Sequence, residues 1–149
     1  MPTELPLQSC TNAKVRQLMR RVAQHYDAEV AQSGLKTTQY SLLSNIAHLG
    51  PVRPVDLAAA LRMTASTLSR NVQPLITAGW VAVSPGASAR SQLLTITPEG
   101  TAKRKEAQRH WKLAQKKLED QLGREHVIAL HALIDKSLAT LGGAGDERV

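Results

Sequence analysis

A polar face within residues 64–79 carries the clearest chemistry of this chain. Hydroxyl, guanidinium and amide side chains recur there at helical spacing, at Ser66, Ser69, Arg70 and Gln73. Apolar side chains recur at the same spacing, at Leu68, Val72, Leu75 and Ile76. Small hydroxyls, an amide and an arginine are groups that hydrogen-bond base edges and phosphates. The pattern therefore predicts an amphipathic helix whose polar face reads a groove of double-stranded DNA.

The distribution of charge favours the same partner. The chain has 19 lysines and arginines against 12 acids, and its net charge is +7. Between residues 51 and 97 the charged side chains are arginines and a single acid, Asp56. A surface poor in carboxylates suits a phosphate backbone, because acids repel phosphates and arginines displace their counterions. The overall excess of basic residues could also serve solubility alone.

The segments around this helix are expected to position it within a winged helix-turn-helix. A short alanine-rich helix at 55–61 precedes it, separated by a two-residue turn. After Gly79 the pattern changes to two short extended runs, 80–84 and 92–97, joined by the turn sequence PGASAR. This hairpin would be the wing. Its single charged residue, Arg90, could reach a minor groove or a phosphate.

Helices are also predicted before this core. The first, with apolar residues at helical spacing before Gly34, would span about twenty residues. Its N-cap is expected among Ser9, Thr11 and Asn12. A second helix would begin after an N-cap at Thr37 or Thr38 and end at a left-handed Gly50 followed by Pro51.

Two further helices follow the predicted wing. Thr97 is expected to cap a helix from Pro98 to Leu122, and Gly123 to end it. The last helix, up to Leu141, has an apolar face too wide for an isolated helix in water. We therefore expect the terminal helices to form a homodimer. A two-fold dimer would present two reading helices to half-sites of a pseudo-palindromic operator, about 34 to 36 Å apart.

The fold class that follows is mainly α with a small β-hairpin wing. One domain is expected over 1–149, with a winged helix core over about 37–100, dimerisation helices over about 9–33 and 101–141, and a flexible tail at 142–149. No secretory signal or membrane span is apparent, which predicts a cytoplasmic protein. Scattered histidines and one cysteine predict no metal site. Without paired carboxylates, an activated nucleophile or a phosphate loop, neither an enzyme nor a cofactor is expected.

Three stretches of the chain resemble the MarR family of bacterial winged-helix transcription regulators. They are GLKTTQYSLL from Gly34, STLSRNVQPLITAGWV from Ser66 and RSQLLTITPEG from Arg90, and the resemblance spans about 15–141. It implies a homodimer with interlocked terminal helices, a recognition helix in the major groove and a wing arginine in the minor groove. The DNA contacts that it implies are Ser66, Thr67, Ser69, Arg70 and, in the wing, Arg90. Gln73 is added from the helical face alone.

Ser88 departs from the family's pattern, because the wing usually carries an aspartate two residues before its arginine. A hydroxyl cannot pair with a guanidinium as a carboxylate does. The substitution predicts a looser wing, or an Arg90 that is held by DNA alone.

The resemblance also implies an effector site between the dimerisation helices and the winged core. Residues that could line it are Arg16, Arg20, His25, Tyr26, Tyr40, His48 and Trp111. Arginines beside aromatic rings suit a small aromatic carboxylate. In the alternative interpretation the aromatic residues belong to the core and the arginines face solvent or DNA.

Cys10 offers a different signal, because some relatives sense organic hydroperoxides through a cysteine near the start of the first helix. A helix N-terminus favours a reactive thiolate. No second cysteine exists to resolve a sulfenic acid within the chain, so a small thiol or another subunit would be needed. An unreactive thiol is the simpler alternative.

We therefore expect a sequence-specific DNA-binding transcriptional regulator, a repressor that a small molecule releases from its operator. A thiol-based oxidant sensor on the same scaffold is one alternative. A non-specific architectural DNA binder is another, and its affinity would depend on salt and hardly on sequence. A winged-helix module that binds proteins would show no DNA affinity.

Overall fold

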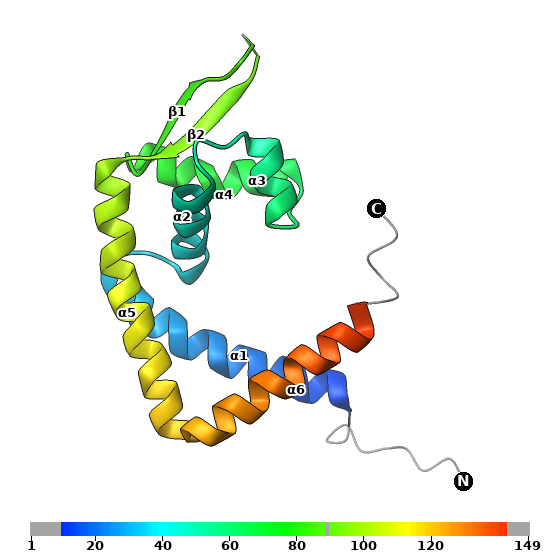
Figure 1. Ribbon diagram of the computed structural model, residues 1–149. Helices are drawn as coiled ribbons and strands as arrows, with labels where there is room; N and C mark the ends of the chain where they lie inside the picture. The colour runs from blue at the N-terminus through cyan, green and yellow to red at the C-terminus, as the bar shows by residue number, and fades with distance from the viewer. Residues whose placement is uncertain (1–9, 89, 143–149) are drawn as a thin grey trace.

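The computed structural model describes residues 10–88 and 90–142. The elements in chain order are α1 (Thr11–Val30), η2 (Ala31–Ser33), α2 (Thr37–Leu49), α3 (Pro54–Ala60), α4 (Ala65–Thr77), β1 (Val81–Pro85), β2 (Gln92–Ile96), α5 (Pro98–Leu122) and α6 (Arg124–Gly142). In Figure 1, α2, α3, α4 and the hairpin gather at one end, whereas α1 and α6 cross at the other and α5 runs between the two ends. The mainly α fold with a β-hairpin is confirmed.

Local hydrogen bonds explain where α4 and α5 begin. The Thr64 hydroxyl oxygen accepts a bond from the Thr67 amide at 3.2 Å, and the Thr97 hydroxyl oxygen accepts one from the Gly100 amide at 3.0 Å. Both satisfy amides that have no partner within the helix. Arg62 turns the chain between α3 and α4 with a φ of 53°. The predicted cap at Thr97 is confirmed.

The start and end of α2 differ from the prediction. Lys36, and not Thr37 or Thr38, is the N-cap, and its amide donates to the Gln39 side chain at 2.9 Å. Gly50 at the C-cap has an extended backbone with φ −71°. Glycine is required there for space, because a Cβ would lie 2.5 Å from the Ile46 carbonyl oxygen.

Two other predicted boundaries also change. Cys10 occupies the N-cap position of α1 and makes no side-chain cap, so Thr11 and Asn12 are helical residues. The remaining candidate, Ser9, lies outside the described residues, as does the predicted tail from 143 onward. Gly142, the first residue of that tail, ends α6.

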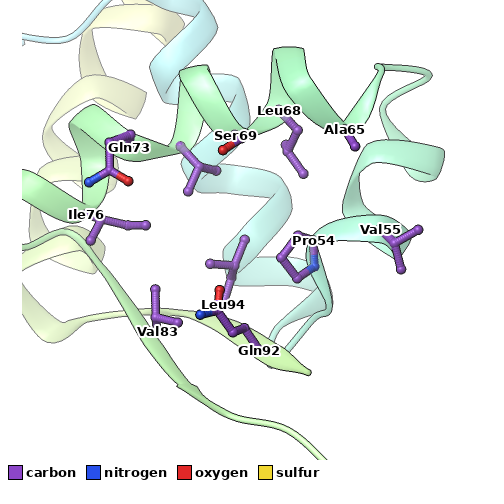
Figure 2. Close-up of a pocket in the computed structure, with 11 residues that line it drawn as sticks. Pro54, Val55, Ala65, Leu68, Ser69, Gln73, Ile76, Val83, Gln92 and Leu94 are labelled. Atoms are coloured by element: carbon purple, nitrogen blue, oxygen red, sulfur yellow. The ribbon is translucent and has the colours of Figure 1, made fainter. Parts of the chain in front are cut away.

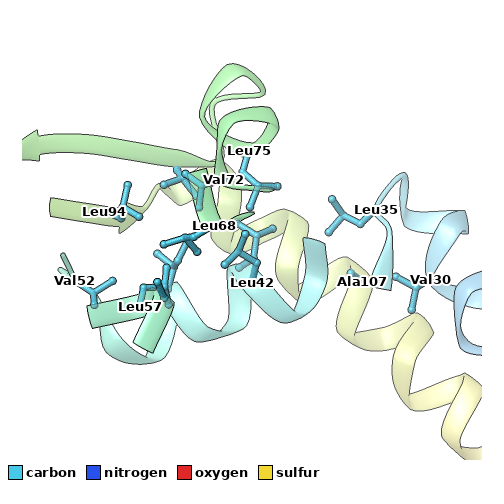
Figure 3. Packing of buried hydrophobic residues seen from close by; sticks show 14 residues of the cluster. Val30, Leu35, Leu42, Val52, Leu57, Leu68, Val72, Leu75, Leu94 and Ala107 are labelled. Atoms are coloured by element: carbon cyan, nitrogen blue, oxygen red, sulfur yellow. The ribbon is translucent and has the colours of Figure 1, made fainter. Parts of the chain in front are cut away.

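The hydrophobic core joins α2, α3, α4 and the hairpin. The buried face of α4 consists of Leu68, Val72 and Leu75, and Ile76 is partly buried beside them, as the apolar spacing predicted. Figure 3 shows Leu68, Val72 and Leu75 in one cluster with Leu42 from α2 and Leu94 from β2. β1 and β2 pair antiparallel, with Val81 opposite Ile96. This packing fixes α4 rigidly and leaves its polar side outward.

The second part of the molecule is an arm of α1 and α5. The His25 Nε2 lies 2.8 Å from the Ala114 carbonyl oxygen. The Tyr26 hydroxyl donates to the Gln115 side chain, and Lys117 pairs with Glu29. Large apolar residues of α1 and α6 stay exposed at this end, and Leu141 shows 74% of its surface. None of the helices in the described part of the chain is long and apolar enough to cross a membrane.

Candidate nucleic-acid interface

The outward side of α4 carries most of the predicted contact residues. Ser66, Ser69, Arg70 and Gln73 are exposed, and Thr67 is half-buried. The Thr67 hydroxyl oxygen accepts a hydrogen bond from the Thr64 hydroxyl at 2.8 Å. Thr67 thus helps to hold the start of the helix, and the Ser66 hydroxyl also lies 3.3 Å from the Thr64 hydroxyl. Ser69, Arg70 and Gln73 make no side-chain hydrogen bond within the described residues.

Two hollows flank α4. The first, of about 310 Å³, lies between α4, the start of α3 and the hairpin. In Figure 2, Ser69 and Gln73 come from α4, and Val83 and Gln92 from the hairpin across the hollow. The second, of about 250 Å³, lies on the side of α2 and contains Arg70. An α-helix with its side chains is about 10–12 Å wide, which matches the major groove of B-DNA.

The turn of the hairpin is closed by main-chain and serine contacts. The Gly86 amide donates to the Ser91 carbonyl at 2.8 Å, and the Ser88 amide donates to the Ser91 hydroxyl oxygen at 3.0 Å. Arg90 is exposed, and among the described residues it has no ion pair. Its guanidinium is therefore available to a phosphate or a groove. Whether the wing is looser without the aspartate stays a prediction.

Charge on this surface is almost entirely positive. Asp56 forms two contacts with the Arg53 guanidinium, at 2.7 and 3.0 Å, so its charge is compensated locally. The hydrogen bond from Arg53 lowers the pKa of the Asp56 carboxyl and raises the pKa of the guanidinium. A polyanion approaching α4 consequently meets no uncompensated carboxylate between residues 51 and 97 of the described chain.

The predicted effector residues separate into two groups. The Trp111 ring lies 6.1 Å from the Tyr26 ring and 6.5 Å from the Tyr40 ring, between centroids, and His25 packs against Tyr26 at 5.9 Å. Burial raises the pKa of the Tyr26 phenol, and the Glu119 carboxylate adds to the shift. These four residues form one aromatic cluster.

The other three lie elsewhere. Arg16, Arg20 and His48 are exposed. Arg16 precedes Tyr26 by ten residues of α1, about 15 Å along the axis. Sequence reasoning did not single out another cation, Arg104, whose Nε is buried without a hydrogen-bond partner among the described residues. Its position two turns before Trp111 on α5 was the available signal.

Two further sequence features lie at the end of the molecule with α1. Cys10 is exposed at the start of α1. A groove of about 290 Å³ between α1, α5 and α6 has an almost entirely apolar lining, which includes Met19, Leu130 and Ile134. Met19 shows 61% of its surface.

Comparisons with known proteins agree with this geometry. A family model described as MarR family matches residues 33–91. The HTH-type transcriptional regulator YwoH of Bacillus subtilis (strain 168) is 27% identical over 93 residues, which are 62% of this chain and 68% of YwoH.

Solved structures extend the likeness to the terminal helices. The M. tuberculosis transcriptional regulator MosR in complex with DNA is 28% identical, with a TM-score of 0.69 over 93% of this chain and 97% of MosR. BpsR of Bordetella bronchiseptica shares the fold at 20% identity, with a TM-score of 0.79 over 91% of this chain and 99% of BpsR. Residues 33–91 therefore match the MarR family, and the chain as a whole has the fold of MarR-family DNA-binding transcriptional regulators.

Proposed function

We propose that this chain is a homodimeric, sequence-specific repressor that a small molecule releases from a pseudo-palindromic operator. The observation that carries the proposal is the exposed polar face of α4. A buried apolar face fixes this helix, and the described part of residues 51–97 around it has no uncompensated acid. Within it, Ser66, Thr67, Ser69, Arg70 and Gln73 contact bases and phosphates in the major groove, and Arg90 contacts the minor groove or a phosphate.

The apolar surface of α1 and α6 supports the homodimer. Isolated apolar residues are common on protein surfaces, but a groove with neighbouring exposed residues such as Met19 and Leu138 is typical of an interface. A second copy of the same surface would cover it around a two-fold axis. The two α4 helices would then face successive turns of one DNA duplex.

The aromatic cluster supports an effector site between α1, α2 and α5. Tyr26, Tyr40 and Trp111 offer ring faces, and the buried Nε of Arg104, on the same helix as Trp111, has no acceptor among the described residues. An aromatic carboxylate would supply both a stacking ring and an anion. In the fold neighbour BpsR, 6-hydroxynicotinic acid regulates DNA binding. We infer that such a ligand changes the angle between the α1–α5 arm and the winged core.

Selection of duplexes from a random pool tests the DNA-binding part. The selected duplex and a scrambled duplex are then titrated with the parent protein and with Arg70→Ala. A regulator should prefer the selected duplex by about a thousandfold or more, and Arg70→Ala should lose about 1 to 3 kcal/mol of that binding. Equal affinity for both duplexes would indicate an architectural binder, and no affinity for either would indicate a protein-interaction module.

The exposure of Cys10 keeps the oxidant sensor as a second candidate. An exposed thiol at a helix start is accessible to organic hydroperoxides. Peroxide should then release the parent protein from the selected duplex, a reductant should restore binding, and Cys10→Ser should not respond. If the parent is indifferent to peroxide, the sensor is excluded and aromatic acids become the ligands to test.

A further inference from the structure

The hollow on the α2 side of α4 contains two cations and no acid. Lys36 comes from the N-cap of α2 and Arg70 from α4, and both side chains line the same space of about 250 Å³. The remaining lining residues are neutral: Thr38, Gln39, Leu42, Asn71 and Pro74. Across the described ranges 10–88 and 90–142, neither cation has an ion pair.

This arrangement favours an anionic occupant. Two like charges that share one hollow repel each other, and the repulsion is strongest when water is displaced. An anion between them would convert the repulsion into two attractions. The neutral neighbours add donors, because the amide groups of Gln39 and Asn71 and the hydroxyl of Thr38 can all donate hydrogen bonds.

The position of the hollow indicates which anion fits. A helix that fills the major groove has one phosphate backbone along each flank, because the groove is only about 12 Å wide. The hollow on the wing side is lined mainly by apolar residues, including Val55, Ile76 and Val83, and contains no cation. Only the flank toward α2 therefore offers paired positive charge among the residues lining these two hollows.

We propose that Lys36 and Arg70 together bind a phosphate of the DNA strand that borders the major groove on the α2 side. The inference rests on the proposed entry of α4 into that groove. Lys36 acts as a point charge without base specificity, so it contributes affinity and fixes the depth and register of α4. Arg70 then lies at the edge of the major groove, where its contact with the phosphate holds the guanidinium beside the bases.

The salt dependence of DNA binding tests the proposal. The variants are Lys36→Ala and, as a matched control, Lys112→Ala, which removes an exposed lysine from α5. Each is titrated at several salt concentrations against the selected duplex and against a scrambled duplex of about 30 base pairs, long enough for two half-sites. Circular dichroism and sedimentation check that both variants keep the fold and the oligomeric state of the parent.

The logarithm of the DNA-binding constant falls linearly with the logarithm of salt concentration, and each lost phosphate contact makes this slope shallower by about 0.9. A dimer loses two contacts, so the slope of Lys36→Ala should be shallower than that of the parent by about 1.8. The advantage of the parent over Lys36→Ala should therefore shrink about tenfold between 50 and 200 mM salt, equally on both duplexes. Lys112→Ala should keep the parent's slope.

Two results would overturn the inference while leaving the proposed function standing. One is a loss confined to the selected duplex, which would make Lys36 a base-reading residue. The other is a parent-like slope for Lys36→Ala. In that case the parent and Lys36→Ala are titrated with inorganic phosphate, and NMR shifts of Gln39 and Asn71 in the parent alone would make the hollow a site for a free anion. If the parent binds neither duplex, the proposed function itself fails.

Discussion

The substitution Ile134→Lys tests the apolar surface that we assign to the dimer. Ile134 lines the groove between α1, α5 and α6, and 43% of its surface is exposed. Full burial of an isoleucine is worth about 1.5–3 kcal/mol, so covering this remainder contributes about 1 kcal/mol per copy. Placing the lysine charge at the interface adds a cost of about 1 kcal/mol per copy. This is well below the cost of a fully buried ion, because the lysine side chain can extend its ammonium toward water.

Two copies of the substitution then cost the dimer about 4 kcal/mol, or about a thousandfold in its dissociation constant. Sedimentation equilibrium over a range of protein concentrations measures this constant directly. Ala129→Lys is the matched control, since Ala129 is an exposed residue of α6 about 140° away around the helix. A dimer of Ile134→Lys as tight as that of the control would refute the assignment, and so would a monomeric parent.

Three other substitutions test separate parts of the structure. Arg53→Ala should raise the pKa of Asp56 toward its ordinary value, and an NMR titration would detect this shift. In the parent, this ion pair stabilises the fold fully at pH values above the ordinary pKa of the carboxyl. Its contribution is lost as the pH falls through the lowered pKa of Asp56 in the folded protein. Gly100→Ala should lower the melting temperature measured by calorimetry, because its Cβ would lie 2.0 Å from the Trp80 carbonyl oxygen. Such overpacking lowers the free energy of unfolding by about 1–3 kcal/mol. Arg90→Ala should weaken binding to the selected duplex without changing the dimer, and unchanged affinity would exclude a wing contact.

Local signals made α4 predictable from the sequence. Leu68, Val72 and Leu75 recur at helical spacing, and they are the residues of α4 that are buried in the core. The cap at Thr97 was predictable for the same reason, because its partner, the Gly100 amide, is three residues away. Periodicity and capping depend on near neighbours, and both are visible in one sequence.

Contacts between distant segments were not predictable in this way. Lys36 joins Arg70 in one hollow only because packing brings the start of α2 beside α4. The cap of α2 is a local feature that was nevertheless mispredicted, because the Gln39 side chain reaches back to the Lys36 amide and made a threonine cap unnecessary. The DNA contact of Thr67 stays a prediction, and its amide and hydroxyl both bond to Thr64.

Hydroxyl-radical footprinting of the parent protein on its selected duplex tests the central claim most directly. If a homodimer reads DNA with two α4 helices, two protected segments should appear, related by a two-fold axis and centred about 10 base pairs or a multiple of that distance apart. The protection at both segments should weaken together in Arg70→Ala. A single protected segment would contradict the account, and so would uniform protection along the whole duplex.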